Sequence, residues 1–445
     1  MSIELLWTDQ CFLLVLVISF AVFIRSARRA HVRRAFQQIF NKPIAVSASL
    51  ILLFFLIIGV LDSIHYKTAT EHQVQSLLDR ILAPLGAEYE KTYSAPLALT
   101  LYTTETMIVD GDARQVYPRL QYPPDDLKNN ADVRQLVRHV LLLAALVSLL
   151  AVIVLWLGLV LIRRRYQRGL QSILTSARAS ALITLFFCFT ALLASYWLSR
   201  ELHLFGTGKI GQDIFYYAVK SIRTGLVIGI LTTLFMMPLA LLLGISAGYF
   251  GGLIDDVIQY IYTTLSSIPG VLLITASILS MQTYISSHPD QFTTLAQTAD
   301  ARLLALCLIL GVTSWTSLCR LLRAEAMKLR EIDFVLAAQA LGSSSFKIIF
   351  KHLLPNVMHI VIITLVLDFS FLVLAEAVLS YVGVGVSPLT ISWGNMINAA
   401  RLELAREPIV WWPMMAAFVF MFILVLASNL FADAVRDAFD PRLSR

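Results

Sequence analysis

Nine long apolar runs constrain the fold of this chain more than any other feature. They cover residues 9–25, 43–61, 139–162, 179–198, 224–247, 267–283, 302–321, 357–382 and 411–432. A helix needs about 20 apolar residues to cross a bilayer, and most of the runs approach or exceed that length. Hydrophobic residues are 58% of the chain and charged residues 14%, whereas a soluble domain is about half apolar and a quarter charged. The pattern predicts an all-α integral membrane protein with about nine transmembrane helices.

Basic residues beside two of the runs predict which loops face the cytoplasm, because loops rich in Lys and Arg stay on that side. The residues concerned are Arg25, Arg28, Arg29, Arg33 and Arg34 after the first run, and Arg163, Arg164, Arg165 and Arg168 after the third. Alternation of the spans then places the N-terminus outside and the 325–356 loop and the C-terminus inside. Since basic residues follow the first run and no small-residue cleavage site does, we expect an anchored helix rather than a cleaved signal peptide.

Residues 62–138 are polar and interrupt the series of spans. Thr68–Tyr93 is typical of a helix broken by a proline. Leu97–Val109 alternates like a strand, Asp110–Asp112 supplies a turn, and Gln115–Leu120 can return antiparallel. The pattern predicts a small α/β domain outside the membrane. Two roles stay open: a cap without chemistry of its own, since so short a stretch has little core to shape a pocket, or a docking surface for a soluble partner.

The segment from Val335 to Asn356, VLAAQALGSSSFKIIFKHLLPN, is a polar and basic stretch between two apolar runs. Its small-residue helix face ends at a glycine, which suits close docking of a partner and a sharp helix stop. The segment resembles the cytoplasmic coupling loop of ABC-importer permeases, whose signature is Glu-Ala-Ala, three residues, Gly, and later Ile-x-Leu-Pro. Leu336 stands where that family has Glu. Five positions match the signature: Ala337, Ala338, Gly342, Leu354 and Pro355.

Further motifs resemble the second permease subunit of the dipeptide/oligopeptide permease family, over about Leu202 to Arg445. Phe205–Asp213, FGTGKIGQD, is similar to that family's exterior motif Gly-Thr-Asp-x-x-Gly-Arg-Asp, with Gly208 and Gln212 in place of its Asp and Arg. The resemblance implies docking of a binding protein at four residues: Gly206, Thr207, Gly211 and Asp213. The other similar stretches are Gly248–Asp255, Ser267–Gly270, Ala375–Gly385, Trp393–Met396 and Asp433–Arg442.

Two acidic residues, Asp368 and Glu376, lie inside a clear apolar run. A charge at mid-bilayer costs about 3 kcal/mol or more, so such residues usually face a cavity or a partner. Eight helical residues put the two roughly 80° apart, near one face. Both are candidates for the translocation path. A buried structural hydrogen bond is the alternative for Asp368, and simple hydration near the outer boundary is the alternative for Glu376. The resemblance assigns no role to Asp368, because the family has a small residue there.

Several kinds of chemistry are not expected of this chain. It has no G-x-x-x-x-G-K-[ST] phosphate loop and no His/Glu pair on one helix face, so we expect no enzyme activity and no bound cofactor or metal. The cysteines at 11, 188, 307 and 319 form no C-x-x-C and are expected to be packing residues. The net charge of +6 sits at the ends of apolar runs, which argues against a nucleic-acid partner.

The resemblance implies a permease subunit of an ATP-driven importer for peptides or peptide-like compounds, in a bacterial inner membrane. Residues 179–445 would be a type I permease core that includes the coupling loop, preceded by two helices (1–61), the 62–138 domain, and a third helix with its linker (139–178). Implied partners are a homologous permease, two cytoplasmic ATPases that carry ATP and Mg, an extracytoplasmic binding protein and the lipid bilayer. An exporter-type permease and a membrane sensor that has lost transport are the alternatives.

Overall fold

The computed structural model describes residues 2–3, 5–27, 30–67, 74–87, 89–109, 112–165, 176–288, 290, 292 and 294–439. The chain divides into two compact units. Unit 1 comprises Met1–Glu4, Phe36–Thr224 and Ile391–Ala434, and unit 2 comprises Leu5–Ala35, Gly225–Thr390 and Val435–Arg445. Three helices pass from one unit into the other: α2 (Ala30–Ile39), α8 (Ile214–Phe250) and α16 (Trp412–Phe439).

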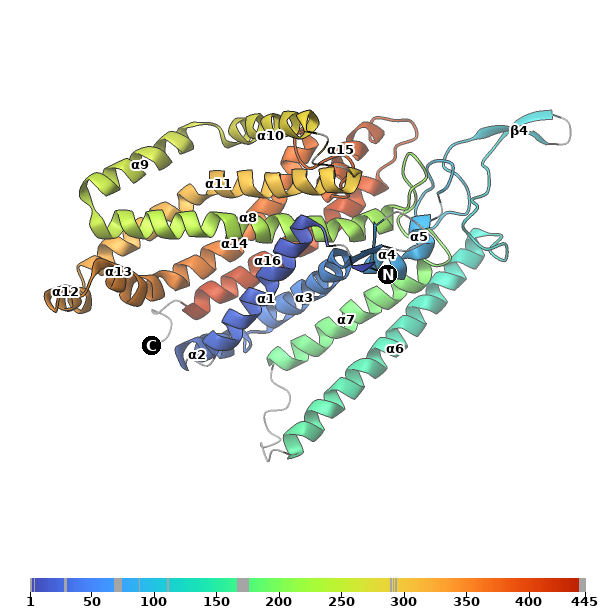
Figure 1. Cartoon of the computed structure of the whole chain (residues 1–445). Coiled ribbons are helices and arrows are strands. Elements are labelled where there is room, and N and C mark those ends of the chain that lie inside the picture. Colours follow the sequence, from blue (N-terminus) through green and yellow to red (C-terminus); the bar gives the residue numbers. More distant parts are fainter. Residues whose placement is uncertain are drawn as a thin grey trace. The chain divides into compact units, whose positions relative to one another are not determined.

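Three long apolar helices of unit 1 run side by side (Figure 1): α3 (Pro43–Ser63), α6 (Asn130–Arg165) and α7 (Ser176–Leu198). The middle one, α7, packs against both others. Most side chains of these helices point outward although they are apolar, which is the pattern of helices that face lipid. The contact between α3 and α7 includes a hydroxyl pair, with Ser47 Oγ 2.6 Å from Ser180 Oγ.

The 62–138 segment, which we call the outer segment after its predicted side of the membrane, mixes short strands and helices within unit 1. A three-stranded antiparallel sheet joins β1 (Ser2–Ile3), β2 (His65–Lys67) and β3 (Val74–Ser76). The short helices α4 (Leu77–Ile81) and α5 (Ala83–Ala87) follow. They replace the single broken helix expected over 68–93, of which residues 68–73 and 88 lie outside the described residues.

A hairpin is present in the outer segment, as predicted: β4 (Glu105–Val109) pairs antiparallel with β5 (Asp112–Val116), and Glu105 lies opposite Val116. The returning strand covers Asp112–Val116 rather than Gln115–Leu120, and positions 110 and 111 of the predicted turn lie outside the described residues. The first strand begins at Glu105 rather than at Leu97. Leu97 has a φ of 56°, which is outside the extended region, and the following residues form only isolated bridges, Leu101 with Ser94 and Thr100 with Arg119.

Unit 2 is organised around α11 (Leu295–Arg330), whose neighbours include α1 (Trp7–Ala27), α9 (Gly252–Ser267), α10 (Gly270–Ser287) and α14 (Leu354–Tyr381). Small residues let α8 approach α11 closely, as the sequence predicts. A Cβ added at Gly248 would lie 2.5 Å from the carbonyl oxygen of Arg323. Since lipid gives no hydrophobic drive between helices, such close backbone contact stabilises the pair through van der Waals packing.

The stretch that links α11 to α14 contains α12 (Asp333–Ala340), α13 (Ser345–Ile348) and the π-helical turn η3 (Ile349–Leu353). The remaining helix, α15 (Trp393–Glu403), belongs to unit 1.

Among the described residues, eight helices are long and apolar enough to cross a membrane: α3, α6, α7, α8, α10, α11, α16 and the continuous stretch Ser345–Tyr381. The ninth predicted span falls in α1, whose apolar part, Trp7–Val22, is shorter. The predicted fold class, a helical membrane protein with a small α/β segment, is confirmed. The arginines at 28, 29 and 168 lie outside the described residues, and the orientation stays a prediction.

Candidate functional site

The predicted coupling segment is a short helix with a defined stop. Helix α12 ends at Ala340, and the chain turns away at Gly342, whose φ is +76°. The amide of Gly342 donates to the carbonyl of Gln339 (2.9 Å), and the amide of Ser343 donates to that of Ala338 (3.0 Å). This pair of bonds is a Schellman motif, which needs a left-handed residue at the position of Gly342. The predicted helix end is therefore confirmed.

One side of α12 is anchored and the other side is open. Val335 is fully buried in the apolar core of unit 2, and Ala338 packs against the same core. Leu336 on the opposite side is 44% exposed, and Ala337 is exposed as well. Farther along, Leu354 is half-buried and Pro355 is exposed within the first turn of α14. Of the predicted coupling residues, Ala338 packs against the core, whereas Leu336, Ala337 and Pro355 are exposed.

A carboxylate–guanidinium pair braces the same part of unit 2. Arg323 on α11 donates through Nε and Nη2 to the two carboxylate oxygens of Asp255 on α9, at 2.5 and 2.6 Å. The hydrogen bond from Arg323, with its charge, lowers the pKa of Asp255. The amide of Gln339 on α12 lies 3.5 Å from the hydroxyl of Tyr249, at the end of α8. The pair fixes α9 against α11, and α12 rests on the adjoining end of α8.

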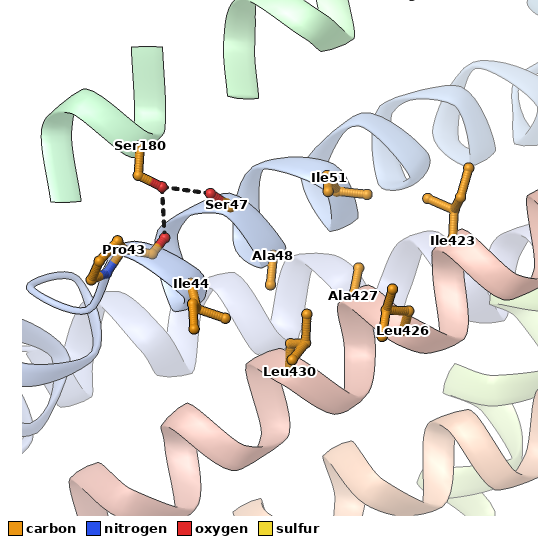
Figure 2. Close-up of a pocket in the computed structure, with 10 residues that line it drawn as sticks. All are labelled: Pro43, Ile44, Ser47, Ala48, Ile51, Ser180, Ile423, Leu426, Ala427 and Leu430. Carbon is orange, nitrogen blue, oxygen red and sulfur yellow. Dashed lines mark hydrogen bonds between the residues drawn. The ribbon is translucent and has the colours of Figure 1, made fainter. Parts of the chain in front are cut away.

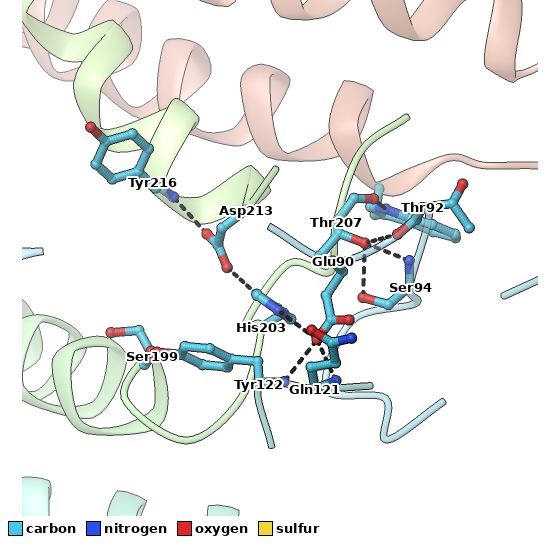
Figure 3. Close-up of polar contacts among 11 residues, drawn as sticks. Glu90, Thr92, Ser94, Gln121, Tyr122, Ser199, His203, Thr207, Asp213 and Tyr216 are labelled. Carbon is cyan, nitrogen blue, oxygen red and sulfur yellow. Dashed lines mark hydrogen bonds and ion pairs between the residues drawn. The ribbon is translucent and has the colours of Figure 1, made fainter. Parts of the chain in front are cut away.

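The exterior motif precedes α8, and in unit 1 the outer segment covers it. Thr207 is fully buried. Its hydroxyl donates to the carbonyl of Thr92 and accepts from the amide of Ser94, each at 2.7 Å (Figure 3). A Cβ added at Gly206 would lie 2.2 Å from the carbonyl oxygen of Ser94. The motif therefore contacts the chain's own outer segment instead of solvent.

The second half of the motif is equally covered. Gly211 has a φ of +76°, and a Cβ there would lie 1.6 Å from the carbonyl oxygen of Glu90. Its own carbonyl accepts from the Glu90 amide at 3.0 Å. Asp213 is 1% exposed, and its Oδ1 accepts from the Tyr216 amide, which caps the start of α8. All four predicted docking residues are buried, and their role in docking stays a prediction.

A buried histidine joins the motif to the outer segment (Figure 3). His203 is 1% exposed, and its Nδ1 lies 2.6 Å from Asp213 Oδ2. Because a carboxylate only accepts, Nδ1 carries a proton. Nε2 lies 3.8 Å from Glu90 Oε1, beyond hydrogen-bond reach. The amides of Gln121 and Tyr122 both donate to Glu90 Oε1 at 2.8 Å.

The two carboxylates set the protonation of this histidine. Burial by itself lowers the pKa of His203, but the interactions with Asp213 and Glu90 outweigh it and raise the pKa to about 9. Burial by itself raises the pKa of Glu90, and here the contact with His203 and the two backbone amides outweigh it and lower the pKa. At neutral pH the cluster therefore holds an imidazolium between two carboxylates.

Sequence reasoning missed His203, Glu90 and a tryptophan that supports the motif. Trp412 is buried, and its Nε1 donates to the carbonyl of Thr207 at 2.9 Å. A signal for His203 was available: it is a lone histidine between two apolar runs, ten residues before the aspartate of the motif. Glu90 and Trp412 carry no such signal, because each is far from the motif in sequence and belongs to no recognisable pattern.

The two acidic residues of α14 differ in their surroundings. Glu376 is buried, and its Oε1 accepts from the hydroxyl of Ser380 at 2.7 Å. Asp368 is half-buried, and no hydrogen bond to it is found among the described residues. The expected hydration of Glu376 is thus replaced by a buried hydrogen bond, whereas Asp368 is the acid that lacks one within the described chain. Their place in a translocation path stays a prediction.

A separate apolar groove of about 560 Å³ lies within unit 1, between α3, α7 and α16 (Figure 2). Its lining is aliphatic apart from two serines. The hydroxyl of Ser180 donates to the carbonyl of Pro43 at 2.8 Å, and Ser47 pairs with Ser180. These hydroxyls are engaged with one another and with the backbone, so the groove offers little to a polar ligand such as a peptide.

The C-terminal part of the chain is similar to known transport proteins. Residues 240–445 match the family described as binding-protein-dependent transport system inner membrane component. A dipeptide transport system permease protein of Lactococcus lactis subsp. cremoris (strain MG1363) is 31% identical over 245 residues, 55% of this chain and 65% of that protein. The match thus spans slightly less than two thirds of that relative's length.

Two other relatives match the same part of the chain. An oligopeptide transport system permease protein of Bacillus subtilis (strain 168) is 28% identical over 243 residues, 55% of this chain and 73% of that protein. A putative peptide transport system permease protein of Brucella suis biovar 1 (strain 1330) is 31% identical over 243 residues, 54% of this chain and 74% of that protein.

The motifs, the membrane-spanning helices and these relatives agree. The family consists of transport components, so the family assignment confirms the prediction that the chain is not itself an enzyme. The chain belongs to the family of binding-protein-dependent transport system inner membrane components.

Proposed function

We propose that this chain is the permease subunit of an ATP-driven ABC importer and that its cargo is a short peptide or a peptide-like compound. The observation that carries the proposal is α12, a short helix anchored by Val335 and stopped at Gly342, with Leu336 presented to solvent. Such a helix suits insertion into a cleft on a soluble partner. The printed names of the relatives, which specify dipeptide, oligopeptide and peptide transport, support the cargo class.

The energy source belongs to partners in this proposal. Two cytoplasmic ATPase subunits bind ATP and Mg, and a homologous permease supplies the other half of the pathway. Closure of the ATPase pair acts through α12 and rocks the core helices between inward-open and outward-open states. Asp368 and Glu376 on α14 are the candidates for contact with the path. Anchoring of α12 by the buried Val335, together with its contact to Tyr249 of α8, favours transmission of force over local bending.

The binding protein would dock on the extracytoplasmic side. Burial of Gly206, Thr207, Gly211 and Asp213 favours an indirect role for these residues: they hold the outer segment, and the outer segment presents the surface. We therefore favour a docking surface over an inert cap as the role of residues 62–138.

Orientation is tested by cysteine labelling in intact cells. The native cysteines are replaced, single cysteines are placed at Arg28, Arg165 and Thr104, and an impermeant thiol reagent is added outside. We expect labelling at position 104 only, since the basic loops should face the cytoplasm. Labelling at position 28 without labelling at 104 would reverse the proposed topology.

The function is tested with the complete transporter. The chain is co-expressed with its cognate ATPases, second permease and binding protein, and uptake of a labelled di- or tripeptide is followed in a strain without other peptide transporters. We expect ATP-dependent uptake that is lost when this chain is deleted. Outward movement of substrate would favour the exporter alternative. Loss of a signalling output with no transport in either direction would favour the sensor alternative.

A further inference from the structure

A polar pocket of about 250 Å³ opens beside the buried histidine of unit 1, and no role is assigned to it by the importer mechanism. It is lined by Tyr89, Glu90, Gln121, Tyr122 and His203. The outer segment provides the first four residues, and the loop before α8 provides the last. The volume lies below the usual range for drug-sized ligands, so the pocket suits a small ligand or the end of a larger one.

The acidic and imidazole side chains that line the pocket are buried and held in place by the surrounding chain. Glu90 is 6% exposed, and its Oε1 is held by two backbone amides. Within the described residues, Glu90 Oε2 receives no hydrogen bond. The Nε2 of His203 is buried and likewise lacks a hydrogen-bond partner in the described chain. Glu90 and His203 both line this small space, and each carries a polar atom that makes no hydrogen bond within the described residues.

The chemistry of these groups selects the ligand. Because the pKa of His203 is about 9, its ring is an imidazolium at neutral pH, with one proton on Nδ1 toward Asp213. Loss of the Nε2 proton as the pH rises turns Nε2 into an acceptor beside the carboxylate of Glu90. The rings of Tyr89 and Tyr122 add π faces, which attract cations. We propose that this pocket binds a small organic cation that carries N–H donors, such as an alkylammonium or a guanidinium group. This assignment does not depend on the proposed import function.

A ligand in the pocket would influence the start of α8 through a short chain of contacts. His203 contacts Asp213, and Asp213 caps the start of α8 through the Tyr216 amide. The titratable groups that face His203 are Glu90 and Asp213, and the Tyr122 ring stacks on the imidazole at 4.6 Å. A bound cation competes with the proton of His203, so binding releases protons and strengthens as the pH rises toward 9.

The experiment is calorimetric titration of the full-length protein in detergent with methylguanidinium chloride, at constant ionic strength. We choose a guanidinium because it stays charged at pH 9. We expect saturable binding, proton release detected by comparing buffers of different ionisation enthalpy, and tighter binding at pH 9 than at pH 7. Sodium acetate is the matched anion and should not bind. Absence of saturable methylguanidinium binding at both pH values would overturn the proposal.

Variants at the exposed Gln121 test whether a charge beside the pocket changes its affinity for a cation, without disturbing the buried core. Gln121→Glu should tighten binding about two- to fivefold, and Gln121→Lys should weaken it by a similar factor or more. Glu90→Gln should weaken binding at least about tenfold, since it removes the charged acceptor. Glu105→Gln is the control, because that carboxylate pairs with Lys91 outside the pocket. Equal affinities in Gln121→Glu and Gln121→Lys would refute a site in this pocket, even if Glu90→Gln fails to fold.

Discussion

Gly342 in the coupling segment and Gly211 in the exterior motif have the same backbone angle, a φ of +76°, and opposite surroundings. A Cβ built on Gly342 meets no atom within 4 Å, whereas one built on Gly211 would lie 1.6 Å from the carbonyl oxygen of Glu90. Both glycines belong to motifs shared in pattern with peptide permeases. One motif is left open by the chain, and the other is covered by the chain's own outer segment.

The difference shows that a motif's pattern does not by itself fix what the motif contacts. The coupling segment keeps an open face, with Leu341 86% exposed beside Gly342. The exterior motif instead uses its glycines for close backbone packing inside unit 1. We therefore expect substitutions at the covered motif to cost stability, and substitutions at the open motif to cost function with little loss of stability.

The largest effect is expected for Gly211→Ala. The left-handed backbone and the clash with Glu90 together should cost about 2–5 kcal/mol, mostly as loss of the packing between motif and outer segment. Thermal unfolding in detergent and limited proteolysis within residues 62–138 measure it. Gly342→Ala is the matched control, since it has the same φ in open space and should cost only about 1–2 kcal/mol. Equal losses of unfolding free energy in the two variants would contradict the inference that one motif is closely packed and the other is open.

The next effect concerns pH. The folded pKa of His203, about 9, lies above its usual value of 6.5, so the stabilisation is complete below about pH 6.5 and is lost as the pH rises through 9. We expect attachment of the outer segment to weaken by about 2–4 kcal/mol between pH 6 and pH 9.5. Stability of the coupling segment should not follow the same curve.

Protease resistance of the outer segment, followed against pH, checks this prediction. His203→Gln should be less resistant than wild type at pH 6 and similar to it at pH 9.5, because the variant has no proton to lose. A variant that kept the full pH dependence would show that another group is responsible.

A functional effect with a small stability cost is expected at the open motif. Gly342→Val should abolish most transport and the stimulation of ATPase by substrate, because a β-branched residue is strained at this φ and enlarges the docking face. Gly342→Asn should retain more activity, since Asn tolerates the left-handed region. The comparison uses uptake and ATPase assays at matched membrane levels. Unchanged coupling in the Val variant would mean that Gly342 is an ordinary helix end away from any partner.

The smallest effect is expected for Leu336→Glu, which restores the residue typical of the family. Leu336 is 44% exposed in this chain, so docking could bury only part of it, and loss of that burial should cost about 1 kcal/mol of assembly free energy. Co-purification of the cognate ATPase with wild-type and variant permease measures it. Equal or greater ATPase recovery with Glu would contradict an interface adapted to Leu336.

The sequence by itself determined the elements whose signals are local. Runs of about 20 apolar residues can satisfy their backbone in lipid only as helices, so the spans follow from length and composition. The Ala-Ala-x-x-x-Gly pattern predicted the helix end at Gly342, because only the adjacent residues decide that geometry. Alternation and a turn likewise predicted the hairpin that the structure places at Glu105–Val116.

The tertiary structure alone decided the surroundings of the exterior motif. Burial of Thr207 and Gly211 depends on Ser94 and Glu90, which lie more than a hundred residues earlier in the chain, and the sequence between them gives no sign of the pairing. The same holds for the carboxylate that faces His203. Helix length and turn geometry are set by neighbours along the chain, whereas the contacts of a polar side chain are set by whichever distant segment packs over it.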